Sequence, residues 1–165
     1  MFGFRKHLST QDVLIHIQEE AMKQAMRHSP RAILALDVKG AFDNVSHVVI
    51  LTNLQSTGCG ERAYNYVQGF LTNRKARIRV GEGVSPLIEL GSRVTPQGSV
   101  LSPLFNMALL NLPKALEAIE GLEHALYADD VSLWTTKAGS HGWMQDTLQT
   151  VAEVVDKYAK ECDLR

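Results

Sequence analysis

Two adjacent carboxylates, Asp129 and Asp130, interrupt two short apolar runs within residues 125–133. Apolar runs of this length, separated by a polar pair, predict a β-hairpin with both acids at its tip. Two like charges beside a sheet make each other's ionisation costly unless a cation neutralises them. The pair is therefore typical of a cation site, although an exposed turn rich in Asp explains the same residues.

A third carboxylate follows another apolar run. Residues 32–36 are all Ala, Ile or Leu, and Asp37 comes directly after them. A continuous apolar run predicts a central strand buried on both faces, with Asp37 at its carboxyl edge. If this strand lies beside the hairpin, Asp37, Asp129 and Asp130 converge. Three carboxylates without a His or Cys cluster make an all-oxygen site of the kind that suits Mg²⁺.

A further segment, at residues 95–103, reads Thr-Pro-Gln-Gly-Ser-Val-Leu-Ser-Pro and lies between the acidic segments. It is accompanied by Leu-Asp-Val-Lys-Gly-Ala-Phe-Asp at 36–43 and by Tyr-Ala-Asp-Asp at 127–130. In order and spacing, the three segments resemble polymerase motifs A, B and C of reverse transcriptases. They are most similar to the motifs of non-LTR (LINE-like) retrotransposons, and the resemblance covers nearly the whole chain.

The resemblance implies RNA-directed DNA polymerase chemistry. A primer 3′-hydroxyl would attack the α-phosphorus of a deoxynucleoside triphosphate with the help of two Mg²⁺ ions, which Mn²⁺ could replace. Asp37 and Asp129 would be the metal ligands, Asp130 a secondary ligand, and the carbonyl of Val38 a further one. The implied partners are an RNA template, a DNA primer and dNTPs.

The resemblance also implies contacts with the nucleotide and the primer. Phe42 is at the position where the family places an aromatic ring that excludes a ribose 2′-hydroxyl. Gln97 and Gly98 are at the motif B positions that contact the templating base and the incoming nucleotide. Tyr127 would lie beside the primer terminus. Each residue also has a plainer interpretation, as a core ring for Phe42 and Tyr127 and as ordinary loop chemistry for the motif B pair.

One basic segment stands out in a chain whose net charge is −1. Residues 73–80 alternate basic with small or apolar side chains, which predicts a strand, and Arg74, Lys75 and Arg77 could contact template or primer phosphates. The same pattern is typical of a solvated strand whose charges protect an exposed edge. The sequence favours neither interpretation, and the net charge lacks the basic balance usual in nucleic-acid-binding domains.

The remaining segments predict helices and a ribbon around these motifs. We expect Asp43 to cap the helix that follows motif A, and Gly81-Glu82-Gly83 to turn the basic strand back into 86–90. Helices are expected at about 10–28, 45–57, 61–72, 102–119 and 142–162. The sequence thus predicts one α/β (α+β) domain over 1–165: a palm-like mixed sheet with packed helices, partial fingers and no thumb.

The composition, 45% hydrophobic and 21% charged, is that of a soluble globular protein. Two isolated cysteines, no secretory signal and no run of membrane-spanning length indicate an intracellular protein without a membrane partner. The family's triphosphate-binding segments, motif D lysine, motif E and thumb are absent from these residues. Motif B is also one residue shorter than usual after Pro103.

Two other functions remain open from the sequence. The missing segments and the shortened motif B would also suit an inactive remnant or a nucleic-acid-binding fragment. An RNA-templated RNA polymerase shares the same chemistry, but Phe42 and Ala128 argue against it.

Overall fold

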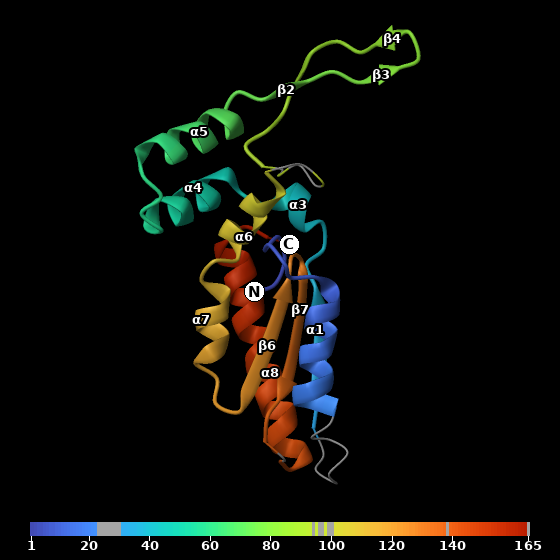
Figure 1. Ribbon diagram of the computed structural model, residues 1–165, viewed down its shortest axis with the longest axis vertical. Coiled ribbons are helices and arrows are strands. Elements are labelled where there is room, and N and C mark those ends of the chain that lie inside the picture. The colour runs from blue at the N-terminus through green and yellow to red at the C-terminus, as the bar shows by residue number, and fades with distance from the viewer. Residues whose placement is uncertain (23–30, 94, 96–97, 99–100, 138, 165) are drawn as a thin grey trace.

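The computed structural model describes residues 1–22, 31–93, 95, 98, 101–137 and 139–164 (Figure 1). A three-stranded sheet lies between α1 (Thr10–Ile17) and α8 (His141–Glu161), and a long two-stranded arm projects from the same end of the molecule as the turn of the β6–β7 hairpin. The predicted combination of helices packed on a palm-like sheet is confirmed. Among the described strands, every pair is antiparallel.

The sheet has the strand order β1-β7-β6, with β1 at Ile33–Asp37, β6 at Leu122–Tyr127 and β7 at Asp130–Thr135. Strands β6 and β7 form the predicted hairpin, in which Tyr127 pairs with Asp130. Strand β1 pairs with the other edge of β7, so that Asp37 is directly opposite Asp130. The sequence segments that carry motifs A and C are therefore neighbours in the sheet.

The prediction that residues 32–37 form a central strand buried on both faces is wrong. Strand β1 lies at an edge of the sheet, its residues alternate between exposed and half-buried, and Ile33 is 48% exposed. Strand β7 takes the centre because it pairs with both β6 and β1. An apolar run indicates that a strand can be buried, but it does not indicate whether the strand pairs on one edge or on both.

The two faces of the sheet belong to different apolar clusters, because successive side chains in a strand point to opposite faces. On one face Leu126, Val131 and Leu133 pack in the main core, which also contains Val151 of α8. On the other face Ala125 and Trp134 pack against Val13 and Ala21, in α1 and the turn that follows it. The sheet is thus held from both sides at its central strand.

The first helix begins as predicted. Ser9 and Asp12 form a capping box at the start of α1, which continues as a π-helical turn, η1, over Gln18–Met22. Residues 23–30 lie outside the described residues, so the predicted continuation to residue 28 is untested. Within α1, Val13 is buried, whereas Leu14 is exposed.

After motif A the chain forms α3 (Ala41–Asn44), α4 (His47–Ser56) and α5 (Glu61–Leu71). The last two confirm the predicted helices. Asp43 was expected to cap the helix after motif A, but it lies inside α3, and Ser46 occupies the N-cap position of α4. Asp43 therefore belongs to a short extra helix, which ends before the N-cap residue of α4.

The prediction of one continuous helix over 102–119 is wrong, because the structure divides this segment into three short elements. The segment forms a 3₁₀ turn, η2 (Ser102–Leu104), then α6 (Phe105–Ala108), then α7 (Leu112–Glu117). Pro113, in the first turn of α7, has no N–H and its ring would clash with a preceding carbonyl, so it cannot lie in a helix interior. At the break, the Tyr158 hydroxyl donates to the carbonyl of Ala108 (2.9 Å) and accepts from the N–H of Asn111 (3.3 Å).

The arm is the predicted ribbon. It consists of short ladders between β2 (Lys75–Ala76) and β5 (Ile88–Glu89) and between β3 (Arg79–Val80) and β4 (Gly83–Val84). Glycine at position 81 has a φ of +58°, as the two-residue turn at the tip of the arm requires. Within the part of the chain that the structure describes, no helix is long and apolar enough to cross a membrane.

Candidate active site

The three predicted acids come together at one end of the sheet. Asp37 is the last residue of β1 and pairs with Asp130, the first residue of β7. The N–H of Val38 donates to the backbone carbonyl of Asp129 at 3.3 Å. The predicted adjacency of the two segments is confirmed, and the metal-binding role of each side chain stays a prediction.

The β6–β7 turn places Asp129 and Asp130 differently. Ala128 and Asp129 are the two turn residues, since Tyr127 and Asp130 close the ladder. Ala128 is buried with a φ of +53°, at a turn position where glycine is the usual residue. Asp129 is half-buried and Asp130 is exposed. Directly paired residues share a sheet face, so Tyr127, Asp130 and Asp37 lie on the face that α1 covers further along.

The carboxylates act on one another electrostatically. Partial burial, then the charge of Asp129, then that of Asp37, raise the pKa of Asp130 above its ordinary value. A bound cation would remove the repulsion that causes part of this rise. The donor set is chemically suited to a hard divalent ion, because it consists of carboxylates from two separate elements.

The carboxylate oxygens near the turn do not converge on a single metal position in this structure. Among the described residues, no three Asp, Glu, His or Cys side chains are close enough together to hold a metal ion as they stand. The Val38 carbonyl accepts from the N–H of Ala41 at 3.1 Å, and a carbonyl oxygen has a second lone pair for a ligand. Binding a metal ion would therefore require the carboxylates to rotate toward it, while the strands keep their register.

Phe42 lies in α3 and is buried, with 8% of its surface exposed. Its ring stacks on Phe105 at a centroid distance of 4.6 Å and meets Phe4 edge to face at 6.3 Å. It belongs to the main core, as the plainer interpretation of this residue expected. Its role toward a sugar is untested by these contacts.

The motif B segment is attached to motif A through the backbone. The N–H of buried Thr95 donates to the carbonyl of Phe42 at 2.8 Å. Gln97 lies outside the described residues. Gly98 has a φ of +73°, and a Cβ built there would have no atom of the described residues within 4 Å.

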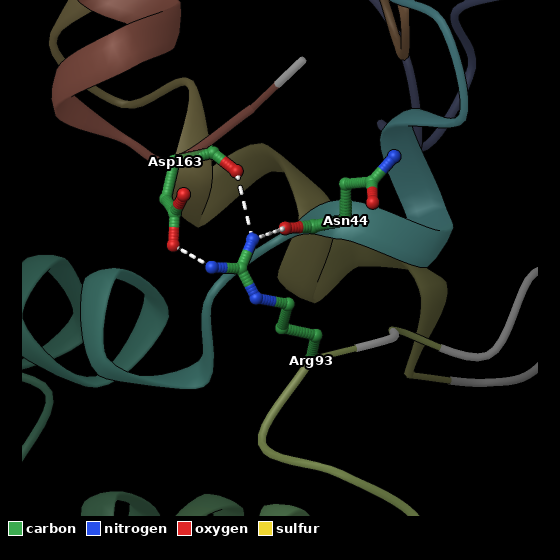
Figure 2. A network of polar contacts seen from close by, with 3 residues as sticks. All are labelled: Asn44, Arg93 and Asp163. Carbon is green, nitrogen blue, oxygen red and sulfur yellow. Dashed lines mark hydrogen bonds and ion pairs between the residues drawn. The ribbon is translucent and has the colours of Figure 1, made fainter.

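A half-buried polar network of Asn44, Arg93 and Asp163 lies just before motif B in the sequence (Figure 2). The Arg93 guanidinium donates to the carbonyl of Asn44 (3.3 Å), to the carbonyl of Asp163 (3.2 Å) and to the Asp163 carboxylate. It thereby connects α3, the segment before motif B and the chain just after α8, at Asp163. Sequence reasoning did not select Arg93, because nothing local indicates a partner so far along the chain.

The remaining residues predicted to contact nucleic acid are Tyr127 in the sheet and the basic residues of the arm. Tyr127 is half-buried and packs against both clusters of the sheet. In the arm, Lys75 forms an ion pair with Glu89 (3.1 Å), and the Arg74 guanidinium lies 5.0 Å from the centre of the Phe70 ring. Arg77 is exposed. Both interpretations of the basic segment stay open.

Comparison with known proteins gives a consistent result. Residues 1–165 match the family model described as reverse transcriptase (RNA-dependent DNA polymerase). The chain is 40% identical over 91 residues to the Pol polyprotein of a type-1 R2 retrotransposable element of Popillia japonica, covering 54% of this chain and 13% of that protein. It is 26% identical over 164 residues to the RNA-directed DNA polymerase of the jockey element of Drosophila funebris, covering 96% of this chain and 18% of that protein.

A solved structure of telomerase from Candida albicans has a similar fold. The TM-score is 0.56 at 15% identity, over 94% of this chain and 30% of that one. This chain thus spans less than a third of the length of each of these proteins.

Proposed function

The chain belongs to the reverse transcriptase family, and from that membership we propose that it carries the carboxylate centre of an RNA-directed DNA polymerase of a non-LTR retrotransposon. The pairing of Asp37 with Asp130, beside Asp129 in the turn, is the observation that carries the proposal. The family match supports the reaction class, and the names of the R2 and jockey relatives support the kind of element.

The proposed reaction joins a primer 3′-hydroxyl to the α-phosphorus of a dNTP, and pyrophosphate leaves. When bound, two Mg²⁺ ions, or Mn²⁺ in their place, would supply activation of the hydroxyl and neutralisation of the phosphate charge. Asp37 and Asp129 would hold the ions from two separate elements, with Asp130 and the Val38 carbonyl as supporting donors. Because both elements belong to one paired sheet, the spacing of the donors is set by backbone hydrogen bonds.

The other residues orient the substrates in this proposal. Phe42 would exclude a 2′-hydroxyl, Gln97 and Gly98 would contact the nucleotide and its template base, and Tyr127 would contact the primer end. Arg74, Lys75 and Arg77 would bind phosphates of the RNA template or DNA primer. The two free thiols, Cys59 and Cys162, suit an intracellular, reducing compartment.

Primer extension on an RNA template with Mg²⁺ and dNTPs tests the proposal. We expect Asp129→Ala and Asp37→Ala to reduce the rate about 10³-fold, the consequence of losing several kcal/mol of charge stabilisation. Asp146→Ala, which removes an exposed acid from α8, is the matched control and should leave the rate unchanged. Equal extension by Asp129→Ala and the unsubstituted chain would contradict the assignment.

The same assay separates the other functions that the sequence left open. Cooperative folding and binding of a primer–template without extension would favour a nucleic-acid-binding remnant. Preference for ribonucleotides over deoxynucleotides would favour an RNA polymerase.

A further inference from the structure

Three aromatic rings, those of Phe4, Phe42 and Phe105, form a contiguous row that includes the motif A residue Phe42. Phe42 is the middle ring: Phe105 stacks on it with an interplanar angle of 29°, and Phe4 meets it at 86°. The three residues come from the N-terminal segment, α3 and α6. Phe42 is buried, whereas Phe4 keeps 41% of its surface exposed at one end of the row.

The segment that carries Phe4 is held firmly at the hairpin turn. The N–H of Phe2 donates to the carbonyl of Leu126 at 2.7 Å, and the buried side-chain amide of Asn106 donates to the carbonyl of Gly3 at 2.8 Å. A Cβ built on Gly3 would lie 2.6 Å from the backbone nitrogen of Ala128, so only glycine fits between the segment and the turn. The segment is therefore fixed to β6, α6 and the turn at once.

The backbone of Phe4 is strained. Its φ is +59°, in the left-handed region that is unfavourable for a residue with a side chain. Such strain persists only where the surroundings determine the conformation, and it is frequent at functional sites. The burial of Phe4 alone does not account for it, because 41% of the residue's surface stays exposed. The strained conformation instead accompanies a T-shaped contact between the Phe4 ring and the Phe42 ring.

We infer that Phe4 is a positioning residue for the sugar: it fixes the ring of Phe42 and so sets how strongly ribonucleotides are excluded. This inference rests on the proposed function and deepens it. A ring can exclude a 2′-hydroxyl only if it cannot tilt away from it. Phe105 stacks on one face of the Phe42 ring, the N–H of Thr95 holds the carbonyl of Phe42, and Phe4 contacts the ring in a T-shaped pair. Without Phe4 the ring gains room to tilt.

Single-nucleotide primer extension with a dNTP and its matched rNTP tests the inference through the ratio of the two kcat/KM values. We expect Phe4→Ala and Phe4→Leu to lower this ratio about 2- to 10-fold, the range that corresponds to loss of one aromatic pair. The kcat/KM for the dNTP should stay within about twofold, and Phe4→Tyr should restore the ratio. Tyr66→Ala removes an exposed ring from α5, is the matched control, and should leave the ratio unchanged.

A double-mutant comparison shows whether Phe4 acts through Phe42. Phe42→Ala should lose most of the discrimination, and adding Phe4→Ala should lower it no further. An independent measurement, the aromatic ¹³C–¹H spectrum of the five phenylalanines, should show a changed Phe42 ring shift in Phe4→Leu.

The outcomes distinguish the inference from the function on which it rests. Extension with an unchanged ratio in Phe4→Ala, or an additive loss in the double mutant, overturns the inference and leaves the proposed function intact. If the unsubstituted chain extends a primer with neither nucleotide, the proposed function falls, and the inference falls with it.

Discussion

The body of the molecule, which is the sheet β1-β7-β6 with its packed helices, and the arm formed by β2–β5 differ in how much of their apolar surface is buried. In the body, Val131, Leu133 and Trp134 of the central strand are at most 1% exposed, and helices cover both faces of the sheet. In the arm, Ile78 and Val80 are 61% and 77% exposed, and the strands pair over two residues at a time. A two-stranded ribbon alone is marginally stable. The difference teaches that the acids lie at the end of a sheet whose strands are held in place by a packed core. The arm, in contrast, presents unburied basic and apolar side chains.

The largest expected difference between the two regions is in stability. Leu133→Ala, in the central strand, should lower the free energy of unfolding by about 2–5 kcal/mol, since it leaves a cavity in a closed core. Val80→Ala in the arm should change it by less than about 0.5 kcal/mol. Urea unfolding followed by circular dichroism measures both. Comparable losses at the two positions would mean that the arm is packed against the body.

A smaller effect is expected at the break between α6 and α7. Tyr158→Phe removes the hydroxyl that contacts Ala108 and Asn111, and should cost about 1–2 kcal/mol because two backbone groups lose their partner. Burial, with the nearby Cys162 thiol, raises the pKa of Tyr158, so the hydroxyl stays a donor across the usual pH range. Tyr66→Phe, at an exposed tyrosine of α5, is the control. No loss in Tyr158→Phe would show that the break is stabilised by other contacts.

A still smaller effect, of opposite sign, is expected at the acids. Because the pKa of Asp130 is raised in the folded state, its ionisation destabilises the fold as the pH rises from the unfolded-state value, about 3.9, through the raised one. Asp130→Asn should therefore stabilise the chain at pH 7 without divalent ions, by less than about 1 kcal/mol at this exposed site. Thermal unfolding should show no difference at pH 3. Destabilisation at pH 7 would mean that the charge has a favourable partner.

The smallest effect on stability is expected in the arm's basic segment. Arg77→Ala should leave the melting temperature unchanged but lower the slope of log K against log salt by about 1 if Arg77 contacts one phosphate. Fluorescence anisotropy with an RNA–DNA duplex at several salt concentrations measures the slope. Lys157→Ala, in the body, should leave it unaltered. An unchanged slope in Arg77→Ala would favour the interpretation of a solvated strand face.

Local features of both regions could be predicted from the sequence. The hairpin at 122–135, helices α5 and α8, and the ribbon turn at Gly81 follow from short patterns that determine their own structure. The adjacency of Asp37 and Asp129 came from the resemblance together with the strand pattern. It did not come from either segment alone.

The remaining features depend on contacts between distant parts of the chain. The edge position of β1 is set by which strand pairs with β7, and Ile33 carries no signal of it. The break before α7 had a local signal in Pro113, which the apolar periodicity of the segment outweighed. Arg93 and Asp163, like Phe4 and Phe42, are far apart in the sequence and come into contact only through the fold. Patterns within a window of a few residues cannot contain such pairs.

The pairing of β1 with β7 also has a consequence for synthesis of the chain. Asp37 is made before the strand that it pairs with, which begins at Asp130. Contacts between such distant residues form late, after the loop between them has been closed at an entropic cost. A growing polypeptide therefore has no assembled acidic centre until the hairpin has been translated, and an interrupted translation product that ends before Asp130 would lack it.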